Sequence, residues 1–436
     1  MKRAAGFVVR VFFRRTAVSG SEQVPRDGPV ILVLNHPNAL IDPLFVLAFA
    51  PRPVSFLAKE PLFHMPIVGR LVRRAGSIPV YRRQDAADMS QNRATFDQVR
   101  AALLAGRAIA LFPEGTSHSD ARLRPFKTGA ARMALDAAAA GNAPVTIVPA
   151  GLYYTAKARF RSSALLRFGA PIRVDATITD SSGEPDATAV RELTATLEAA
   201  LALVTLQADH DAALQLVTRA ERIYSSGDPA PRPSHDLADQ FALRQRFVRG
   251  YARLRIDAPA ELDQLERRLE RFDGALARVR LAPESIASSS SIPAGDVLRR
   301  GTVIVALFPI AMIGMVIHWP AYRIIGPLLT RGMKVETDAL GTAKILVAAL
   351  LFPLSWIVAG VLVGWRGGWI AGVVAGLVAP ACGYAALRFL ELLDRSVGIL
   401  RGIVLRSVRP RTFRRLEAER RKIRETIVAL GERAER

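Results

Sequence analysis

Short apolar runs alternate with longer amphipathic stretches over the first 175 residues of the chain. The runs are bounded by turn residues and carry many β-branched side chains, a pattern typical of buried strands. We predict strands at 30–34, 54–58, 78–81, 108–112, 145–150 and 167–174. Stretches with helical periodicity lie between them, for example at 86–105 and 128–140. This alternation predicts an α/β domain at 20–175, with a mostly parallel central sheet flanked by helices.

The pattern becomes helical beyond this domain. Residues 176–298 are rich in Ala, Leu, Arg and Glu, and their apolar positions repeat with helical spacing at 187–224 and 236–280. A proline-rich stretch at 228–233 separates the two blocks, and serines at 288–291 indicate a short linker. We identify no candidate chemistry here and predict a helical region and linker.

Long uncharged runs predict a membrane section at 299–390. The run 345–365 has 21 residues without a charge, and 369–387 has 19. About 20 apolar residues suffice for a helix to cross a hydrocarbon core of about 30 Å. Only three residues separate the two runs, so we expect a tight hairpin of C-terminal transmembrane helices.

An earlier apolar run, 302–322, is interrupted by Pro309 and Pro320. It could span the membrane or re-enter it. Basic residues dominate both flanks of the membrane section, and positive charge near membrane segments favours the cytoplasmic side. An even number of crossings would place both flanks there, so we expect this run to re-enter or lie shallow.

Charge points to an anionic partner. The net charge is +21 over 436 residues, which favours a polyanion such as nucleic acid or an anionic membrane. The sequence carries no nucleic-acid-binding signature, and the uncharged runs favour the membrane. The ends, 1–19 and 391–436, are predicted basic amphipathic helices suited to the headgroup layer. The first could instead pack on the α/β domain, and the second could be a solvated tail.

Two polar residues follow the first predicted strand. His36 lies just past the run 30–34, and five residues separate it from Asp42. A loop and the first turn of a helix can bring this carboxylate onto the imidazole. A carboxylate on one ring nitrogen fixes the tautomer and stabilises the imidazolium when the other nitrogen takes a proton. The pair therefore predicts a base that deprotonates a hydroxyl. The single cysteine, Cys382, excludes intrachain disulfides.

Further blocks make this pair more specific. Phe-Pro-Glu-Gly-Thr at 112–116 follows another predicted strand, and Gly76 to Arg83 and Val148 to Gly151 complete the set. Together with Asn35-His36 and Asp42, they resemble the glycerolipid acyltransferase family. The long spacing between His36 and Asp42 resembles the branch related to glycerol-3-phosphate and dihydroxyacetone-phosphate acyltransferases. The family usually has Arg where this chain has Ser117.

The resemblance implies a membrane-bound O-acyltransferase of phospholipid biosynthesis. It would move a fatty acyl group from acyl-CoA or acyl carrier protein to a hydroxyl of a glycerol phosphate, either glycerol 3-phosphate or lysophosphatidate. His36 and Asp42 would be catalytic, with no metal and no cofactor besides the donor thioester. The substrate-binding candidates are Asn38, Lys59, Arg82, Arg83, Glu114, Gly115, Thr116 and Lys127.

Glu114 would hold an arginine or bind a glycerol hydroxyl, and the cations would bind the acceptor phosphate. We expect the catalytic domain to face the cytoplasm from the inner, cytoplasmic membrane. Two alternatives remain open: an acyl ester or thioester hydrolase, and a non-enzymatic lipid-binding membrane protein.

Overall fold

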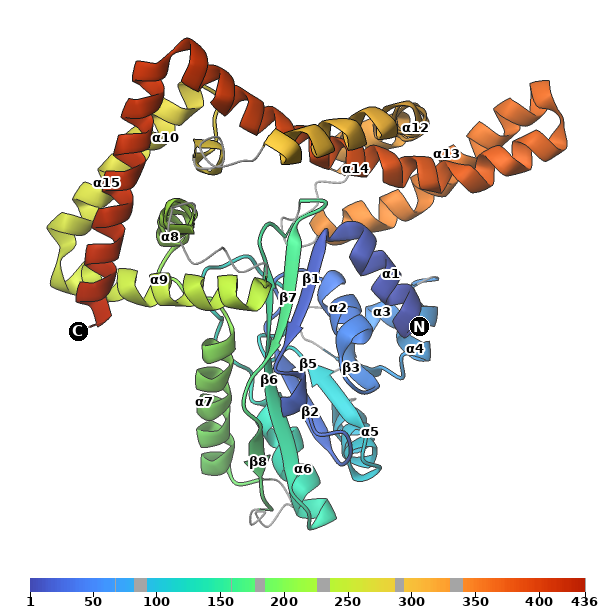
Figure 1. Cartoon of the computed structure of the whole chain (residues 1–436). Helices are drawn as coiled ribbons and strands as arrows, with labels where there is room; N and C mark the ends of the chain where they lie inside the picture. The colour runs from blue at the N-terminus through green and yellow to red at the C-terminus, as the bar shows by residue number, and fades with distance from the viewer. Residues whose placement is uncertain are drawn as a thin grey trace. The chain divides into compact units, whose positions relative to one another are not determined.

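The chain folds into two compact units. The computed structural model describes residues 1–66, 68–81, 92–157, 159–176, 185–225, 236–286, 294–329 and 340–435 (Figure 1). The first unit consists mainly of Met1–Asp211, and the second mainly of Leu243–Val335 and Ala343–Arg436.

A mixed eight-stranded sheet forms the centre of the first unit. Its strands are β1 (Arg15–Ser19), β2 (Val30–Leu34), β3 (Val54–Lys59), β4 (Ile78–Val80), β5 (Ala108–Leu111), β6 (Val145–Tyr154), β7 (Ser163–Phe168) and β8 (Ile172–Val174). Their order is β1-β7-β6-β2-β5-β3-β4, and β8 pairs with β6. Strands β2 to β6 are parallel, whereas β7 and β8 run antiparallel to β6. The predicted α/β fold with a mostly parallel sheet is confirmed.

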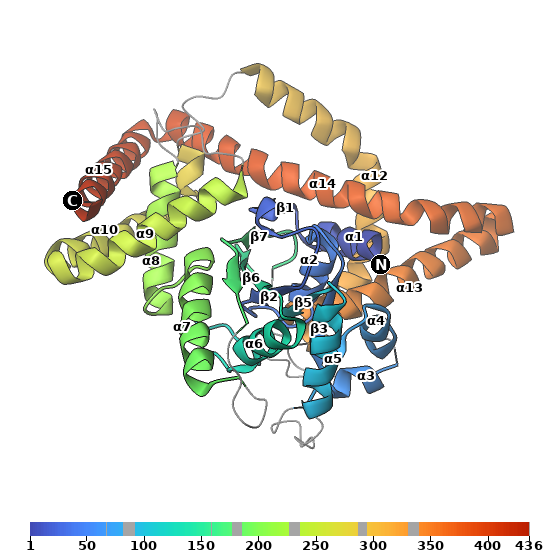
Figure 2. The ribbon, with the colours of Figure 1, turned by 90° about the horizontal axis from the view of Figure 1, so that it is seen from below.

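Helices cover both faces of this sheet (Figures 1 and 2). They are α1 (Lys2–Phe12), α2 (Ile41–Phe49), α3 (Pro61–His64), α4 (Val68–Arg74), α5 (Asn92–Leu104), α6 (Gly129–Gly141) and α7 (Ala187–Val204). Ile31, Ile109 and Ile147 share one core with α5, α6 and α7. Helices α1 and α2 pack together on the opposite face. Every residue of β2 is buried, because strands flank β2 on both sides and helices cover it above and below.

Two details of this unit differ from the sequence-based expectation, and a third matches an alternative that the sequence left open. Residues 15–19 form β1, so the sheet begins before residue 20. This strand is half-buried and lacks the continuous apolar run of a central strand. The run 167–174 is not one strand, because Gly169 and Pro171 separate β7 from β8. Helix α1 packs on the domain through its buried face.

The second unit is helical. Its helices are α8 (Asp211–Ser225), α9 (Leu237–Asp257), α10 (Pro259–Arg278), α12 (Ala294–Pro327), α13 (Leu340–Gly367), α14 (Trp369–Val408) and α15 (Pro410–Glu435). The first residues of α9 and α13 are grouped with the first unit. The predicted helical blocks 187–224 and 236–280 are each divided in two. The second divides at Ala258, because Pro259 starts a new helix at its first turn.

Three helices are long and apolar enough to cross a membrane: Leu298–Pro327, Ala343–Gly367 and Trp369–Val408. Pro309 and Pro320 lie inside α12, which continues through both. Proline is tolerated in membrane helices when neighbouring groups satisfy the freed carbonyls. The two prolines therefore do not break the run 302–322, which has the length and composition to span a membrane. Its expected re-entrant or shallow placement stays a prediction.

The predicted amphipathic tail is also corrected. Helix α14 continues to Val408, well past the expected boundary at 391. Helix α15 does have an apolar face, but Phe413, Leu416, Ile423 and Ile427 are buried within the unit. Helix α10 packs against α15, and the two are joined by an ion pair of 2.6 Å between Arg268 Nε and Glu419 Oε1. The apolar face is therefore covered by protein and not available to lipid headgroups.

Close packing between β6 and the end of α7 generates a stability prediction. A Cβ added at Gly151 would overlap the backbone carbonyl of Val204. We expect Gly151→Ala to destabilise the first unit by about 1–3 kcal/mol, which lowers Tm by about 3–10 °C. Thermal unfolding in detergent measures this. Gly129→Ala is the matched control, because the space around Gly129 is open; equal Tm values for the two variants would contradict the packing argument.

Candidate active site

The ends of two adjacent parallel strands carry the candidate site. His36 lies two residues after β2, and Glu114 lies three residues after β5. Val33 pairs with Leu111 in the register of these strands. The side chains of His36 and Glu114 therefore lie at the same level of the carboxyl edge. This edge is where parallel α/β sheets place their sites.

The structure brings the predicted pair together. His36 Nδ1 and Asp42 Oδ2 are 2.8 Å apart. Asp42 lies in the first turn of α2 and its side chain is fully buried, whereas the His36 side chain is 16% exposed. The ring of Phe112 stacks on the imidazole, with centroids 3.9 Å apart and an interplanar angle of 11°. Nδ1 is held by the carboxylate, which leaves Nε2 as the nitrogen that can exchange a proton with a substrate.

The loop between the two residues has an unusual backbone. Ala39 has φ of 30°, a left-handed conformation that non-glycine residues rarely adopt. Strained residues of this kind persist where the surrounding structure holds them. Here the loop is held by Asn38, whose backbone N–H donates to Asp42 Oδ2 at 2.7 Å and whose side-chain Nδ2 donates to the Lys157 carbonyl at 3.0 Å. Asn38, a predicted substrate-binding residue, is buried and positions this loop.

Tyr154, at the end of β6, is a site residue that the sequence analysis missed. Its hydroxyl donates to Asp42 Oδ1 at 2.6 Å. Its ring stacks on Phe13 with a centroid distance of 5.3 Å. Burial, followed by the charge of Asp42 and the hydrogen bond to it, raises the pKa of Tyr154 well above its usual value of 10.0. The hydroxyl therefore remains a donor throughout the neutral range. No sequence motif marks Tyr154, because the predicted strand ended at residue 150.

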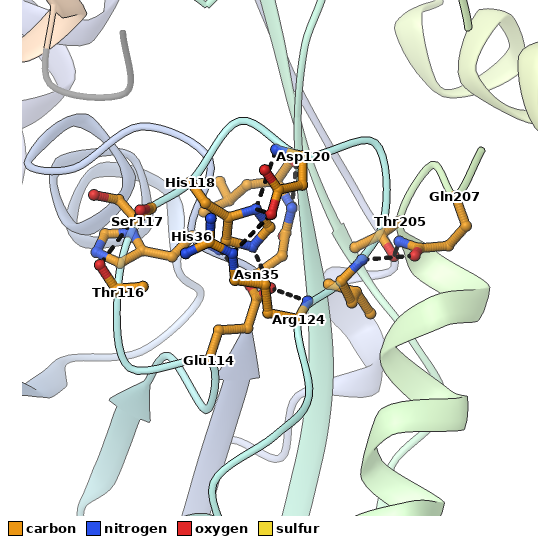
Figure 3. A network of polar contacts seen from close by, with 12 residues as sticks. Asn35, His36, Glu114, Thr116, Ser117, His118, Asp120, Arg124, Thr205 and Gln207 are labelled. Carbon is orange, nitrogen blue, oxygen red and sulfur yellow. Dashed lines mark hydrogen bonds and ion pairs between the residues drawn. The ribbon is translucent and has the colours of Figure 1, made fainter. Parts of the chain in front are cut away.

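Glu114 joins the loops on either side of the site (Figure 3). Its buried carboxylate accepts hydrogen bonds from the His36 backbone N–H at 3.2 Å and the Arg124 backbone N–H at 2.8 Å. It also contacts His118 Nε2. The expected roles were binding of an arginine side chain or a glycerol hydroxyl. The structure places Glu114 where it holds the backbone of His36, and those two expected roles stay predictions.

His118 is a second residue without a role in the sequence analysis. Its backbone N–H donates to the His36 carbonyl at 3.1 Å, and its Nδ1 accepts from the Asp120 N–H at 3.2 Å. Arg124 Nε lies 2.7 Å from Asp120 Oδ2, and this hydrogen bond is the largest of the effects that lower the pKa of Asp120. The loops that carry His36 and Glu114 are thus joined by two backbone contacts: the His36 N–H donates to Glu114, and the His118 N–H donates to the His36 carbonyl.

Two of the predicted phosphate-binding cations lie at this edge. Lys59 is exposed at the end of β3. Val30 and Val54 both pair with Ala108, so Lys59 is level with Asn35, two strand spacings or about 10 Å away.

Lys127 approaches the second motif. A Cβ built on Gly115 would lie 2.5 Å from Lys127 Nζ, and Gly115 has φ of +74°. Thr116 is half-buried, and its hydroxyl donates to the Ser117 carbonyl at 3.4 Å. The remaining candidates, Arg82 and Arg83, lie outside the described residues.

The bond between Tyr154 and Asp42 can be tested by stability. Tyr154→Phe removes a hydrogen bond to a buried carboxylate, and we expect a loss of about 1.5–3 kcal/mol near pH 8. The folded pKa of Tyr154 is raised, so wild-type stability falls as pH rises above about 10, where the unfolded tyrosine ionises first. The deficit of the variant should therefore shrink above that pH.

Thermal unfolding of both proteins between pH 7 and 11 measures this convergence. Tyr153→Phe is the control, because Tyr153 does not bond Asp42. A constant difference between wild type and Tyr154→Phe across this range would contradict the assignment.

Comparisons with known proteins identify what this domain is similar to. Residues 15–153 match the family model described as Acyltransferase. Glycerol-3-phosphate O-acyltransferase 1 of Saccharomyces cerevisiae is 24% identical, over 97% of this chain and 69% of its own length. The 1-acyl-sn-glycerol-3-phosphate acyltransferase of Borreliella burgdorferi is 35% identical, over 32% of this chain and 51% of its own length.

A solved structure is also similar. The crystal structure of the 1-acyl-sn-glycerophosphate acyltransferase PlsC from Thermotoga maritima aligns with 45% of this chain and 76% of its own, at 21% identity and a TM-score of 0.32. The family resemblance predicted from the motifs is confirmed by the family model and the two sequence relatives. Residues 15–153 therefore form a domain that matches the Acyltransferase family.

Proposed function

We propose that this protein is a membrane-bound O-acyltransferase of phospholipid biosynthesis. It transfers a fatty acyl group from an acyl thioester to a hydroxyl of a glycerol phosphate, either glycerol 3-phosphate or lysophosphatidate. The observation that carries the proposal is the partly exposed His36 held at 2.8 Å by the buried Asp42, within a domain that matches the acyltransferase family. The relatives named above act on these two acceptors according to their names.

The geometry supports a direct transfer. His36 Nε2 takes the hydroxyl proton while the acceptor oxygen attacks the thioester carbonyl carbon. Asp42 holds Nδ1 and stabilises the imidazolium that forms. When the carbon–sulfur bond breaks, the imidazolium returns the proton to the departing thiolate. The products are an ester and a free thiol, and the enzyme forms no covalent intermediate.

Cations at the carboxyl edge suit the acceptor phosphate. The Lys59 side chain makes no hydrogen bond or ion pair with the described part of the chain, and Lys127 Nζ lies against Gly115. These two lysines, with Arg82 and Arg83, are the proposed phosphate ligands. Lys127 would substitute for the arginine that the family usually has at the position of Ser117.

The donor would be acyl-CoA or acyl carrier protein, with no other cofactor. The three apolar helices indicate association with a membrane. We propose the inner, cytoplasmic membrane, with the catalytic domain facing the cytoplasm, where such donors are made available.

Substitution of the catalytic pair tests the reaction. We expect His36→Ala to lower the rate of acyl transfer by at least about 10²–10⁴-fold, because it removes the base. Asp42→Asn should lower it by up to about 10⁴-fold, because the amide no longer orients the ring. Purified protein in detergent, labelled acyl donor and each acceptor in turn provide the assay.

His64→Ala is the matched control, because the His64 side chain is 76% exposed and pairs only locally with Glu60. Near-normal turnover by pure His36→Ala protein would overturn the mechanism. Release of free fatty acid without any acceptor-dependent product would favour a hydrolase instead.

The role of Lys59 is separable by kinetics. We expect Lys59→Ala to raise KM for the acceptor by about 10-fold or more, since it removes one charge-assisted contact. KM for the donor should change little. Lys422→Ala, on α15, is the charge-matched control. An equal rise in both KM values would reject the assignment of Lys59 to the acceptor phosphate.

A further inference from the structure

Exposed apolar side chains are concentrated on one part of the acyltransferase unit. Among the described residues up to 211, seven large apolar side chains are exposed. Five of the seven lie on α1 and the α3–α4 hairpin: Met1, Phe7, Val11, Met65 and Leu71. The other two, Leu104 and Leu203, lie at the ends of α5 and α7. Clustering of this kind marks an interaction surface, whereas scattered exposed apolar residues do not.

Helix α1 has two apolar faces. Ala5, Val9 and Phe12 are buried against the domain. Phe7 and Val11, four residues apart, point away from it with exposures of 69% and 41%. The inner face packs the helix on the domain, whereas the outer stripe is exposed. The exposed Arg3 and Arg10 flank this stripe.

The α3–α4 hairpin also exposes apolar side chains next to basic ones. Met65 and Leu71 are 45% and 48% exposed. Contacts within the hairpin include a hydrogen bond of 2.8 Å from the Gly69 N–H to the Met65 carbonyl. Arg70, Arg73 and Arg74 are exposed beside it. The N-terminal end of α1 and helix α4 lie side by side in both views (Figures 1 and 2).

The charge of these segments selects the partner. Residues 1–15 and 61–77 together contain eight Lys and Arg residues and no Asp or Glu. Apolar side chains surrounded by basic ones, without acidic residues, match an anionic lipid surface: the apolar groups enter the headgroup boundary and the cations attract the phosphates. Arginine stems also contribute apolar area while their charged ends stay at the headgroups.

We propose that α1 and the α3–α4 hairpin form a lipid-docking surface that lays the acyltransferase unit on an anionic bilayer. The surface is defined by Phe7, Val11, Met65 and Leu71 with their flanking arginines. It is distinct from the apolar helices α12, α13 and α14, which belong to the second unit. Lys59 lies two residues before the start of α3, so docking brings the acceptor end of the site to the level of lipid headgroups.

Lipid quenching tests the surface without requiring turnover, so its outcome is independent of the proposed reaction. The full-length protein carries Cys382→Ser and one new cysteine, at Phe7 or at Leu71, labelled with bimane. It is reconstituted into phosphatidylcholine vesicles with 30% phosphatidylglycerol, with and without nitroxide-labelled lipid. We expect nitroxide lipid to quench these two probes at least about threefold more than matched probes at Leu104 and Leu203, because quenching requires contact with the bilayer.

Charge dependence gives a second readout. Arg70→Glu with Arg74→Glu, or vesicles of phosphatidylcholine alone, should reduce the quenching of the Leu71 probe toward the control level, as should high salt. Equal quenching at all four positions would overturn the proposal. The proposal would also be overturned if the probes at Phe7 and Leu71 were shielded from water in detergent solution but not quenched by nitroxide lipid. That result would assign the surface to contact between copies of the chain.

Discussion

The buried carboxylate of Asp42 is the constraint on which the acyltransferase site depends. A charge taken out of water costs several kcal/mol unless hydrogen bonds replace its hydration. Three donors do so here: the imidazole of His36, the backbone N–H of Asn38 and the hydroxyl of Tyr154. They come from the end of β2, the following loop and the end of β6. Only a sheet in which β6 lies beside β2 can assemble them.

Glu114, after the neighbouring strand β5, is a second buried carboxylate whose hydration is replaced by hydrogen bonds. Its donors are backbone N–H groups of His36 and Arg124 and the ring of His118, so the charge holds the loops after β2 and β5 in register. Through Glu114, the motif holds the backbone of His36 in place. The cations that suit a phosphate lie at the borders of this network, at Lys59 and Lys127, where their side chains stay exposed.

In the helical unit, the exposed apolar side chains are concentrated on helices other than the one that is richest in arginine. Helices α12, α13 and α14 expose apolar side chains along most of their length. Close glycine contacts, such as Gly360 with Gly372, allow α13 and α14 to pack tightly. Helix α15 is rich in arginine, yet its apolar face is buried with α10. Basic charge alone therefore does not identify the surfaces that meet lipid; exposure of the apolar residues among the charges does.

The sequence by itself determined the features that depend on neighbouring residues. Period and composition identified β2 and β5, the parallel sheet and the three apolar runs, because burial on a strand or a lipid-facing helix leaves a local pattern. His36 and Asp42 were found for the same reason: one loop and one helical turn bring them together.

Tertiary structure alone decided the rest. Tyr154 reaches Asp42 across 112 positions of the chain, and nothing local marks that contact. The edge strand β1 lacks an apolar run because one of its sides is unpaired. The burial of α15 depends on α10, more than a hundred residues earlier, since an amphipathic pattern states that a face is covered but not whether lipid or protein covers it.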